Sequence, residues 1–90
     1  MAAAIIAKTT TATGTLQGGR TRLKSFAVVT AGSGSPQVVF KNGSSGDTLL
    51  DMSFTVSDNI QVTIPDHGII FNDECHVTLT NCISLTGFFG

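Results

Sequence analysis

Hydrophobic and polar residues alternate along much of this chain. In "LLDMSFTV", residues 49–56, one parity is apolar and the other is mostly polar, and "NIQVTI" (59–64) and "CHVTLT" (75–80) repeat the pattern. A period of two residues is typical of antiparallel strands that bury one face and expose the other. No stretch shows a helical period, so the pattern predicts an all-β protein.

Clusters of Gly, Pro, Asn, Asp and Ser separate these runs, among them "QGG", "AGSGSP", "KNGSSGD" and "PDHG". Short strands with a turn about every ten residues are typical of a β-sandwich or a jelly roll. We therefore predict a single domain over residues 1–90, a small antiparallel β-sandwich or jelly roll of about eight strands. The loop-like "TTTATGT" leaves a second option for residues 1–14, which could form an N-terminal arm. The predicted strands are 3–13, 21–30, 37–41, 48–56, 59–64, 68–71, 75–80 and 84–89.

The composition favours a subunit of an assembly. Ninety residues provide one modest core. Charged residues make up only 12% of the chain, about half the usual share, so the surface has little protection against association. The start "MAAAIIAKTT" lacks the basic region and the length of a secretory signal, and no apolar run approaches the roughly 18 residues of a membrane span. We expect a cytoplasmic location and no membrane partner.

The charges are segregated along the chain. All bases precede residue 47, and all acids lie at or after it. Two interpretations remain open: basic strands pair with acidic strands inside the domain, or basic and acidic edges meet neighbours in an assembly. Five unclustered bases, with no Tyr or Trp, do not predict nucleic-acid binding. The bases are Lys8, Arg20, Arg22, Lys24 and Lys41, of which the middle three are expected to form a stripe on one strand face.

Residues 73–90, "DECHVTLTNCISLTGFFG", contain both cysteines and invite a redox hypothesis. The alternation predicts a hairpin with the loop Asn81-Cys82-Ile83, because an odd loop length sets Leu79 and Leu85 on the same core face. Cys82 would then lie at the exposed tip. Cys75 would face the core at the far end, beyond the reach of a disulfide. Both are expected to be free thiols, in line with a reducing compartment.

No catalytic, cofactor-binding or metal site is expected. Cys75 and His76 are adjacent in a strand and point to opposite faces, and the chain lacks the paired ligands on a tight loop that zinc sites use. His67 is a turn residue in "PDHG", without the serine motif that an Asp-His pair would need. The Gly-Ser runs lack the Lys-Ser ending of a phosphate-binding loop.

The candidate interface residues come from three parts of the chain. The alternation assigns the six phenylalanines to the core, but Phe88 has the opposite parity to Phe89 and is available to a partner. The apolar start of the chain and the basic stripe are the other two parts. The interface candidates are Ile5, Ile6, Arg20, Arg22, Lys24 and Phe88.

Three short motifs resemble a known group of proteins. "GSSGDTLLDM", "VTIPDHGIIF" and the C-terminal "VTLTNCISLTGFFG" are similar to segments of small all-β proteins of short-tailed phages of marine bacteria, including cyanophages. In that group a glycine-rich turn leads into an "LL" strand, an "IPxxGIxF" turn follows, and a "TN" hairpin ends in an aromatic pair plus glycine. The corresponding residues here are 43–50, 64–71 and 80–90, with Phe89 in place of the usual tyrosine.

The resemblance implies a non-enzymatic structural protein of the virion, assembled in the host cytoplasm. It implies a capsid decoration or cement protein that forms a homo-oligomer, with a trimer favoured, and that binds the major capsid protein or another virion protein. A tail or fibre accessory protein is one alternative. A carbohydrate-binding module is another, but such modules stack sugars on Trp or Tyr, and the chain has neither.

Overall fold

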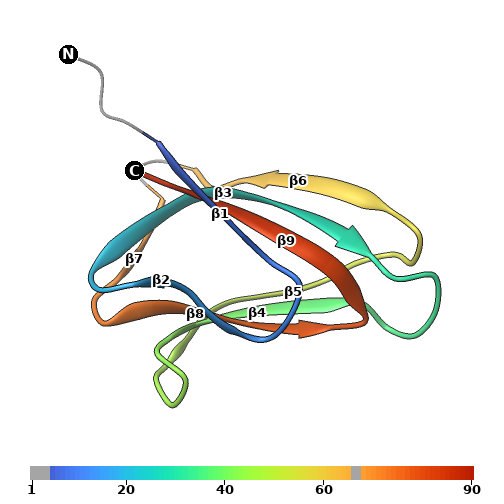
Figure 1. The fold of residues 1–90 in the computed structure, drawn as a ribbon, viewed down its shortest axis with the longest axis horizontal. Helices are drawn as coiled ribbons and strands as arrows, with labels where there is room; N and C mark the ends of the chain where they lie inside the picture. The colour runs from blue at the N-terminus through green and yellow to red at the C-terminus, as the bar shows by residue number, and fades with distance from the viewer. Residues whose placement is uncertain (1–4, 66–67) are drawn as a thin grey trace.

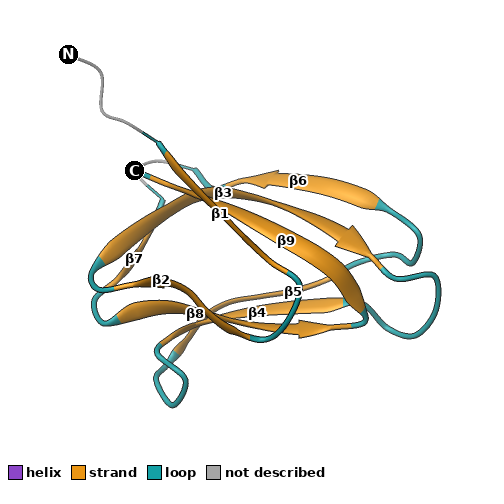
Figure 2. Ribbon diagram, viewed as in Figure 1, coloured by secondary structure: helices purple, strands orange, loops and turns teal. Residues whose placement is uncertain are grey.

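The computed structural model describes residues 5–65 and 68–90, which form nine strands and no helix (Figure 1, Figure 2). Every strand is antiparallel to its neighbours, so the predicted all-β antiparallel fold is confirmed. The strands are β1 (Ile6–Thr10), β2 (Gly14–Gly18), β3 (Thr21–Thr30), β4 (Gln37–Asn42), β5 (Thr48–Ser53), β6 (Asn59–Thr63), β7 (Ile69–Phe71), β8 (Glu74–Thr80) and β9 (Cys82–Phe89).

The strands form two sheets that lie one over the other in Figure 1. Sheet A has the order β1-β9-β3-β6, with β7 also paired to β3, and sheet B has the order β2-β8-β4-β5. The pairs are nested along the chain: β1 with β9, β2 with β8, β3 with β6 and β4 with β5. A long antiparallel hairpin wrapped into two sheets in this way is a jelly roll.

The core lies between the two sheets and is built from inward-facing residues of both. The Phe26 ring of β3 and the Phe40 ring of β4 are 5.0 Å apart between centroids, and they join sheet A to sheet B. Phe71 continues this contact, with its ring centroid 6.3 Å from that of Phe40. The other buried hydrophobic residues are Leu16, Leu23, Val28, Val38, Cys75, Val77, Leu85 and Phe89.

The predicted first strand, 3–13, is wrong. The chain forms two strands there, β1 in sheet A and β2 in sheet B, joined by residues 11–13. The Thr10 hydroxyl donates to the Ala12 carbonyl at 2.8 Å, a local bond that turns the chain within the loop-like "TTTATGT". Residues 6–10 pair with β9 and are therefore part of a sheet, not a free arm, and Leu16 of the unpredicted β2 enters the core.

The predicted strand 48–56 is too long, because β5 ends at Ser53. Its partner β4 begins at Gln37, so the ladder has no further residue to pair with. The chain turns away instead: the Phe54 N–H donates to the Pro36 carbonyl at 2.9 Å, and Ser57 has a φ of 54°. The other predicted strands agree with the structure to within two residues at each end.

The predicted hairpin at residues 75–89 is also wrong. β8 belongs to sheet B and β9 to sheet A, and only Asn81 separates them, in the left-handed region with a φ of 52°. Leu79 and Leu85 do face the same core, but from opposite sheets. Alternation determines which face a residue occupies and leaves the neighbouring strand undetermined.

Candidate interaction surface

Both cysteines are free thiols, as the sequence predicts. Cys75 is fully buried, and burial raises the pKa of its thiol from 9.0 to about 12. The expected exposed position of Cys82 is wrong: it is half-buried, its Sγ lies 3.3 Å from the Thr80 carbonyl oxygen, and burial raises its pKa. Because the thiolate is the reactive species, both thiols are poor nucleophiles at neutral pH.

Other polar groups near these cysteines do not gather into a site. Cys75 faces the core, while His76, next to it in β8, pairs with Lys41 and Thr15 of the flanking strands. Within residues 5–65 and 68–90, no three His, Cys, Asp or Glu side chains lie close enough to share a metal ion. That same part of the chain holds no helix that is long and apolar enough to cross a membrane. His67 lies outside the described residues.

The tertiary structure brings residues from both ends of the chain into one row across sheet A. The Gly90 N–H donates to the Arg22 carbonyl at 3.2 Å, and Arg22 lies opposite Ile70 in the β3–β7 pair. On the other side, Ile5 lies beside Gly90, since a Cβ built on this glycine would be 2.8 Å from the Ile5 Cδ1. Ile5, Gly90, Arg22 and Ile70 therefore follow one another on the outer face of the sheet.

Two further candidates join this row. Phe88 is half-buried on the outer face, where it pairs with Ala7 of β1, while its neighbour Phe89 is in the core. Lys24 occupies a bulge in the β3–β9 pairing, and its Cε would lie 3.2 Å from a Cβ on Gly90. Ile6 is 47% exposed, but its pairing with Phe89 directs it toward the inner side, at the uncovered edge of the sheet. We call the outer-face set Ile5, Arg20, Arg22, Lys24, Ile70 and Phe88 the assembly face.

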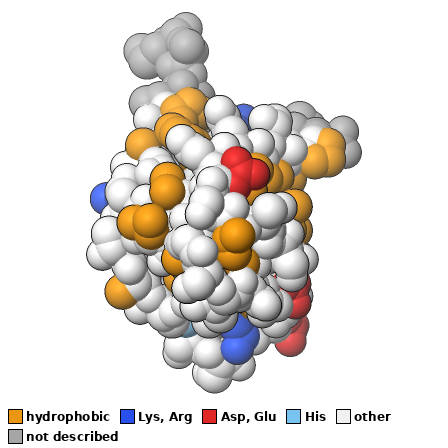
Figure 3. All heavy atoms as spheres, turned by 90° about the vertical axis from the view of Figure 1, so that its right-hand side faces the viewer, with side chains coloured by type: hydrophobic (Ala, Val, Ile, Leu, Met, Phe, Trp, Pro, Cys, Tyr) orange, Lys and Arg blue, Asp and Glu red, His pale blue; other side chains and the backbone are white. Residues whose placement is uncertain are grey.

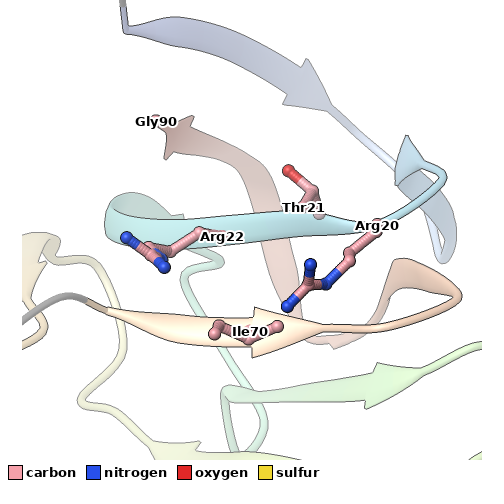
Figure 4. A pocket seen from close by; sticks show the side chains of 5 residues that line it. All are labelled: Arg20, Thr21, Arg22, Ile70 and Gly90. Carbon is pink, nitrogen blue, oxygen red and sulfur yellow. The ribbon is translucent and has the colours of Figure 1, made fainter. Parts of the chain in front are cut away.

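The assembly face contains a hollow of about 340 Å³ lined by Arg20, Thr21, Arg22, Ile70 and Gly90 (Figure 4). We call it the basic hollow. The Arg20 guanidinium extends from the β3 side toward β7, whereas the Arg22 guanidinium lies alongside β3. The Arg22 Nε is buried and has no hydrogen-bond partner in the described part of the chain. A buried donor without an acceptor is costly, so the hollow is suited to a group that brings negative charge.

The basic residues of β3 have no acidic partner strand. β3 pairs with β6, β7 and β9, and none of these strands contains an Asp or Glu. No side-chain hydrogen bond between described residues involves a lysine or arginine. The interpretation that basic strands pair with acidic strands within the domain is therefore wrong for β3. It holds for β4, which contains Lys41 and pairs with β5 and β8, the strands of Asp51 and Glu74.

Three acidic residues are held by backbone contacts near Asn42 and Gly43, at the end of β4 in the opposite sheet. The Asp73 N–H donates to the Asn42 Oδ1 at 2.8 Å, and the Asn42 N–H donates to the Asp47 carbonyl at 2.9 Å. The Glu74 carbonyl accepts the Gly43 N–H at 3.1 Å. We call Asp47, Asp73 and Glu74 the acidic corner. The adjoining loop, residues 43–47, projects from the sandwich at the lower edge of Figure 1.

The far end of the sandwich, formed by the loops around residues 31–36, 54–58 and 81–83, has a different character (Figure 3). Val56 and Ile83 are exposed there, but apolar side chains on this view are separated by polar ones. This end lacks the combination of paired arginines and aliphatic side chains that the assembly face has. It therefore provides a control surface for experiments on the assembly face.

Sequence reasoning found five of the six residues of the assembly face and missed Ile70 and the role of Gly90. Ile70 lies in a predicted strand, but its neighbours Ile69 and Phe71 are apolar too, so no alternation marked it as facing outward. The pairing of β7 with the basic end of β3 could not be predicted either, because strand order depends on contacts between distant segments.

A comparison of this chain with protein-family models, with curated proteins and with solved structures found no match.

Proposed function

We propose that this protein is a non-enzymatic structural subunit that acts by binding copies of itself and a larger protein lattice. The observation that carries the proposal is the assembly face, where residues from the start, the β3 segment and the end of the chain converge. Protein interfaces are enriched in arginine and aromatic residues, and their strongest contacts come from such anchors. Two arginines, Phe88 and two exposed isoleucines form this combination.

The size and fold of the protein support the same conclusion. A domain of this length buries only somewhat more than about 60% of its unfolded surface, so contacts between subunits add stability that the single core does not supply. The jelly roll occurs in viral capsid and lectin domains, an analogy at the level of fold. The chain has no Trp or Tyr with which a lectin-like site could stack a sugar, so the assembly role is the better supported.

The motifs that resemble proteins of marine phages make a phage capsid the proposed lattice. In this proposal the protein decorates or cements the capsid as a trimer that contacts the major capsid protein, in virions assembled in the host cytoplasm. A tail or fibre accessory role is the alternative, and it uses the same face. Mass spectrometry of purified capsids and tails separates the two, because a decoration protein is expected in many copies in the capsid fraction alone.

The test of the proposal is sedimentation of the purified protein, alone and with capsids that lack it. We expect an oligomer alone and co-sedimentation with capsids. The variant Ile5→Asp/Phe88→Asp should remain folded, because both side chains lie outside the core, and should lose both interactions. Val56→Asp/Ile83→Asp, which places the same charges at the far end, is the matched control. A wild-type protein that stays monomeric at high concentration and does not bind capsids would show that the proposal is wrong.

A further inference from the structure

The basic hollow and the acidic corner carry opposite charges on opposite sheets of one molecule. Arg20 and Arg22 line the hollow on sheet A, while Asp47 and Asp73 lie at the end of β4 in sheet B. The Asp47 carboxylate makes no side-chain hydrogen bond within the described residues, since its contact with Asn42 uses the backbone carbonyl. The basic hollow therefore carries positive charge, and the acidic corner carries negative charge.

We propose that the basic hollow of one copy receives the loop 43–47 of a second copy, so that Asp47 and Asp73 pair with Arg20 and Arg22. This inference rests on the proposed self-association and names the contact that produces it. An arginine guanidinium group can bind a carboxylate through two parallel hydrogen bonds. Two arginines at one hollow therefore fix the orientation of a bound carboxylate as well as strengthening the contact.

The loop has the shape that an inserted segment requires. It is closed at its base by the Asn42–Asp47 hydrogen bond and within the turn by a 3.2 Å bond from the Gly46 N–H to the Gly43 carbonyl. A Cβ at Gly46 would lie 1.7 Å from the Asn42 carbonyl oxygen, so this tight turn depends on glycine. Its tip contains only Ser44 and Ser45, both exposed, while Asp47 lies at its base, so the serines enter the hollow and Asp47 meets the arginines at the rim. A small, preordered loop loses little conformational freedom on binding.

The receiving surface provides a complementary floor. Gly90 contributes no side chain to the hollow, and Ile70 of β7, 40% exposed, offers an apolar surface beside the arginines. Because hollow and loop are different patches, the contact is heterologous, and repetition closes a ring or extends a filament.

The test uses charge reversal in the full chain, with self-association measured by sedimentation velocity over a range of concentrations. Arg20→Glu/Arg22→Glu and Asp47→Lys/Asp73→Lys should each weaken self-association by more than about tenfold, because like charges then face each other. Combining all four substitutions in one chain restores opposite charges at every contact, whatever the ring size. We therefore expect the fourfold variant to recover most of the association.

Matched controls change the net charge equally at other places. Lys8→Glu/Ser53→Glu/Gln61→Glu is the control for the hollow, and Asp51→Lys/Asp58→Lys is the control for the corner. Both controls should associate like the wild type. If hollow or corner reversals have no more effect than these controls, or if the fourfold variant stays dissociated, the inferred contact is wrong while self-association itself stands. If the wild type does not self-associate but binds capsids, the second copy is not the occupant.

Asp66 of the same chain is tested separately, as an alternative partner of Arg22 within one copy. Asp66 lies outside the described residues but is two positions from Gly68, whose Cβ would be 3.3 Å from the Arg22 Cγ. We expect the effects of Asp66→Asn and Arg22→Gln on the melting temperature to be additive. A strongly non-additive double variant would show that Asp66 and Arg22 form an internal pair, and it would overturn the inference.

Discussion

The Gly90 N–H donates a hydrogen bond of 3.2 Å to the Arg22 carbonyl, and this contact joins the two ends of the assembly face. The bond aligns β9 with the start of β3. Since Gly90 has no side chain, the space above it stays open as part of the basic hollow. The same absence makes this glycine a place where the hollow can be filled without disturbing the core.

Gly90→Val should weaken self-association while leaving the fold intact. The new Cβ meets the Ile5 Cδ1 at 2.8 Å and the Lys24 Cε at 3.2 Å, which are the ends of flexible side chains and can move. We expect the free energy of unfolding to change by less than about 0.5 kcal/mol, as for most surface substitutions. Chemical denaturation and sedimentation velocity measure the two effects separately.

The control for this substitution is Gly87→Ala, which points into the core. Its Cβ would lie 2.8 Å from the Leu16 Cδ2 and 3.0 Å from the Phe89 ring. Overpacking of this kind costs about 1–3 kcal/mol of stability. A Gly90→Val variant that is destabilised as much as Gly87→Ala would contradict the placement of Gly90 outside the core.

Phe26→Ala and Phe88→Ala should separate stability from assembly. Phe26 is fully buried and packs on Phe40 across the two sheets, so its truncation should cost about 3–5 kcal/mol. Phe88 is half-buried on the outer face, and its loss should cost about 1 kcal/mol while weakening self-association. Urea unfolding at low protein concentration, where the subunit is monomeric, checks the ranking. Equal losses of stability would mean that Phe88 belongs to the core.

Asn81 should tolerate glycine and resist a β-branched residue. Its φ of 52° lies in the left-handed region, which glycine and asparagine adopt at low cost. We expect Asn81→Val to lower the free energy of unfolding by about 1–2 kcal/mol and Asn81→Gly to have a smaller effect. Because Asn81 is the single residue between β8 and β9, the comparison tests the passage from one sheet to the other. Equal tolerance of both substitutions would favour a flexible hairpin loop instead.

Stability should fall in alkali because of Cys75. Its pKa is 9.0 before burial and about 12 in the folded protein, so above pH 9 the unfolded chain loses the thiol proton first. The contribution to stability is complete below pH 9 and declines by up to about 1.4 kcal/mol per pH unit until about pH 12. We expect the free energy of unfolding, measured in urea at pH 8 to 11, to fall less steeply with pH in Cys75→Ala than in Cys82→Ala. An equally steep fall in the two variants would mean that Cys75 is not the group responsible.

Several features of this protein follow from local chemistry and were predictable from the sequence. The period-two alternation predicted an all-β fold and assigned Cys75, Val77, Leu85 and Phe89 to the core, because successive side chains of a strand point to opposite faces. Gly, Pro and Asn clusters marked most of the turns. Both cysteines are free, as predicted, although the hairpin from which that prediction was argued does not form.

Only the tertiary structure decided which strands are neighbours. The segments 75–80 and 84–89 have the alternation of a hairpin, yet they lie in different sheets, because wrapping the chain as a jelly roll gives both a partner and buries both apolar faces. The assembly face depends on the same choice: Ile5, Arg22, Ile70 and Gly90 meet through the pairings of β1, β9, β3 and β7. Alternation is a property of one strand, whereas pairing is a property of the whole chain, since it depends on which arrangement covers all apolar faces at once.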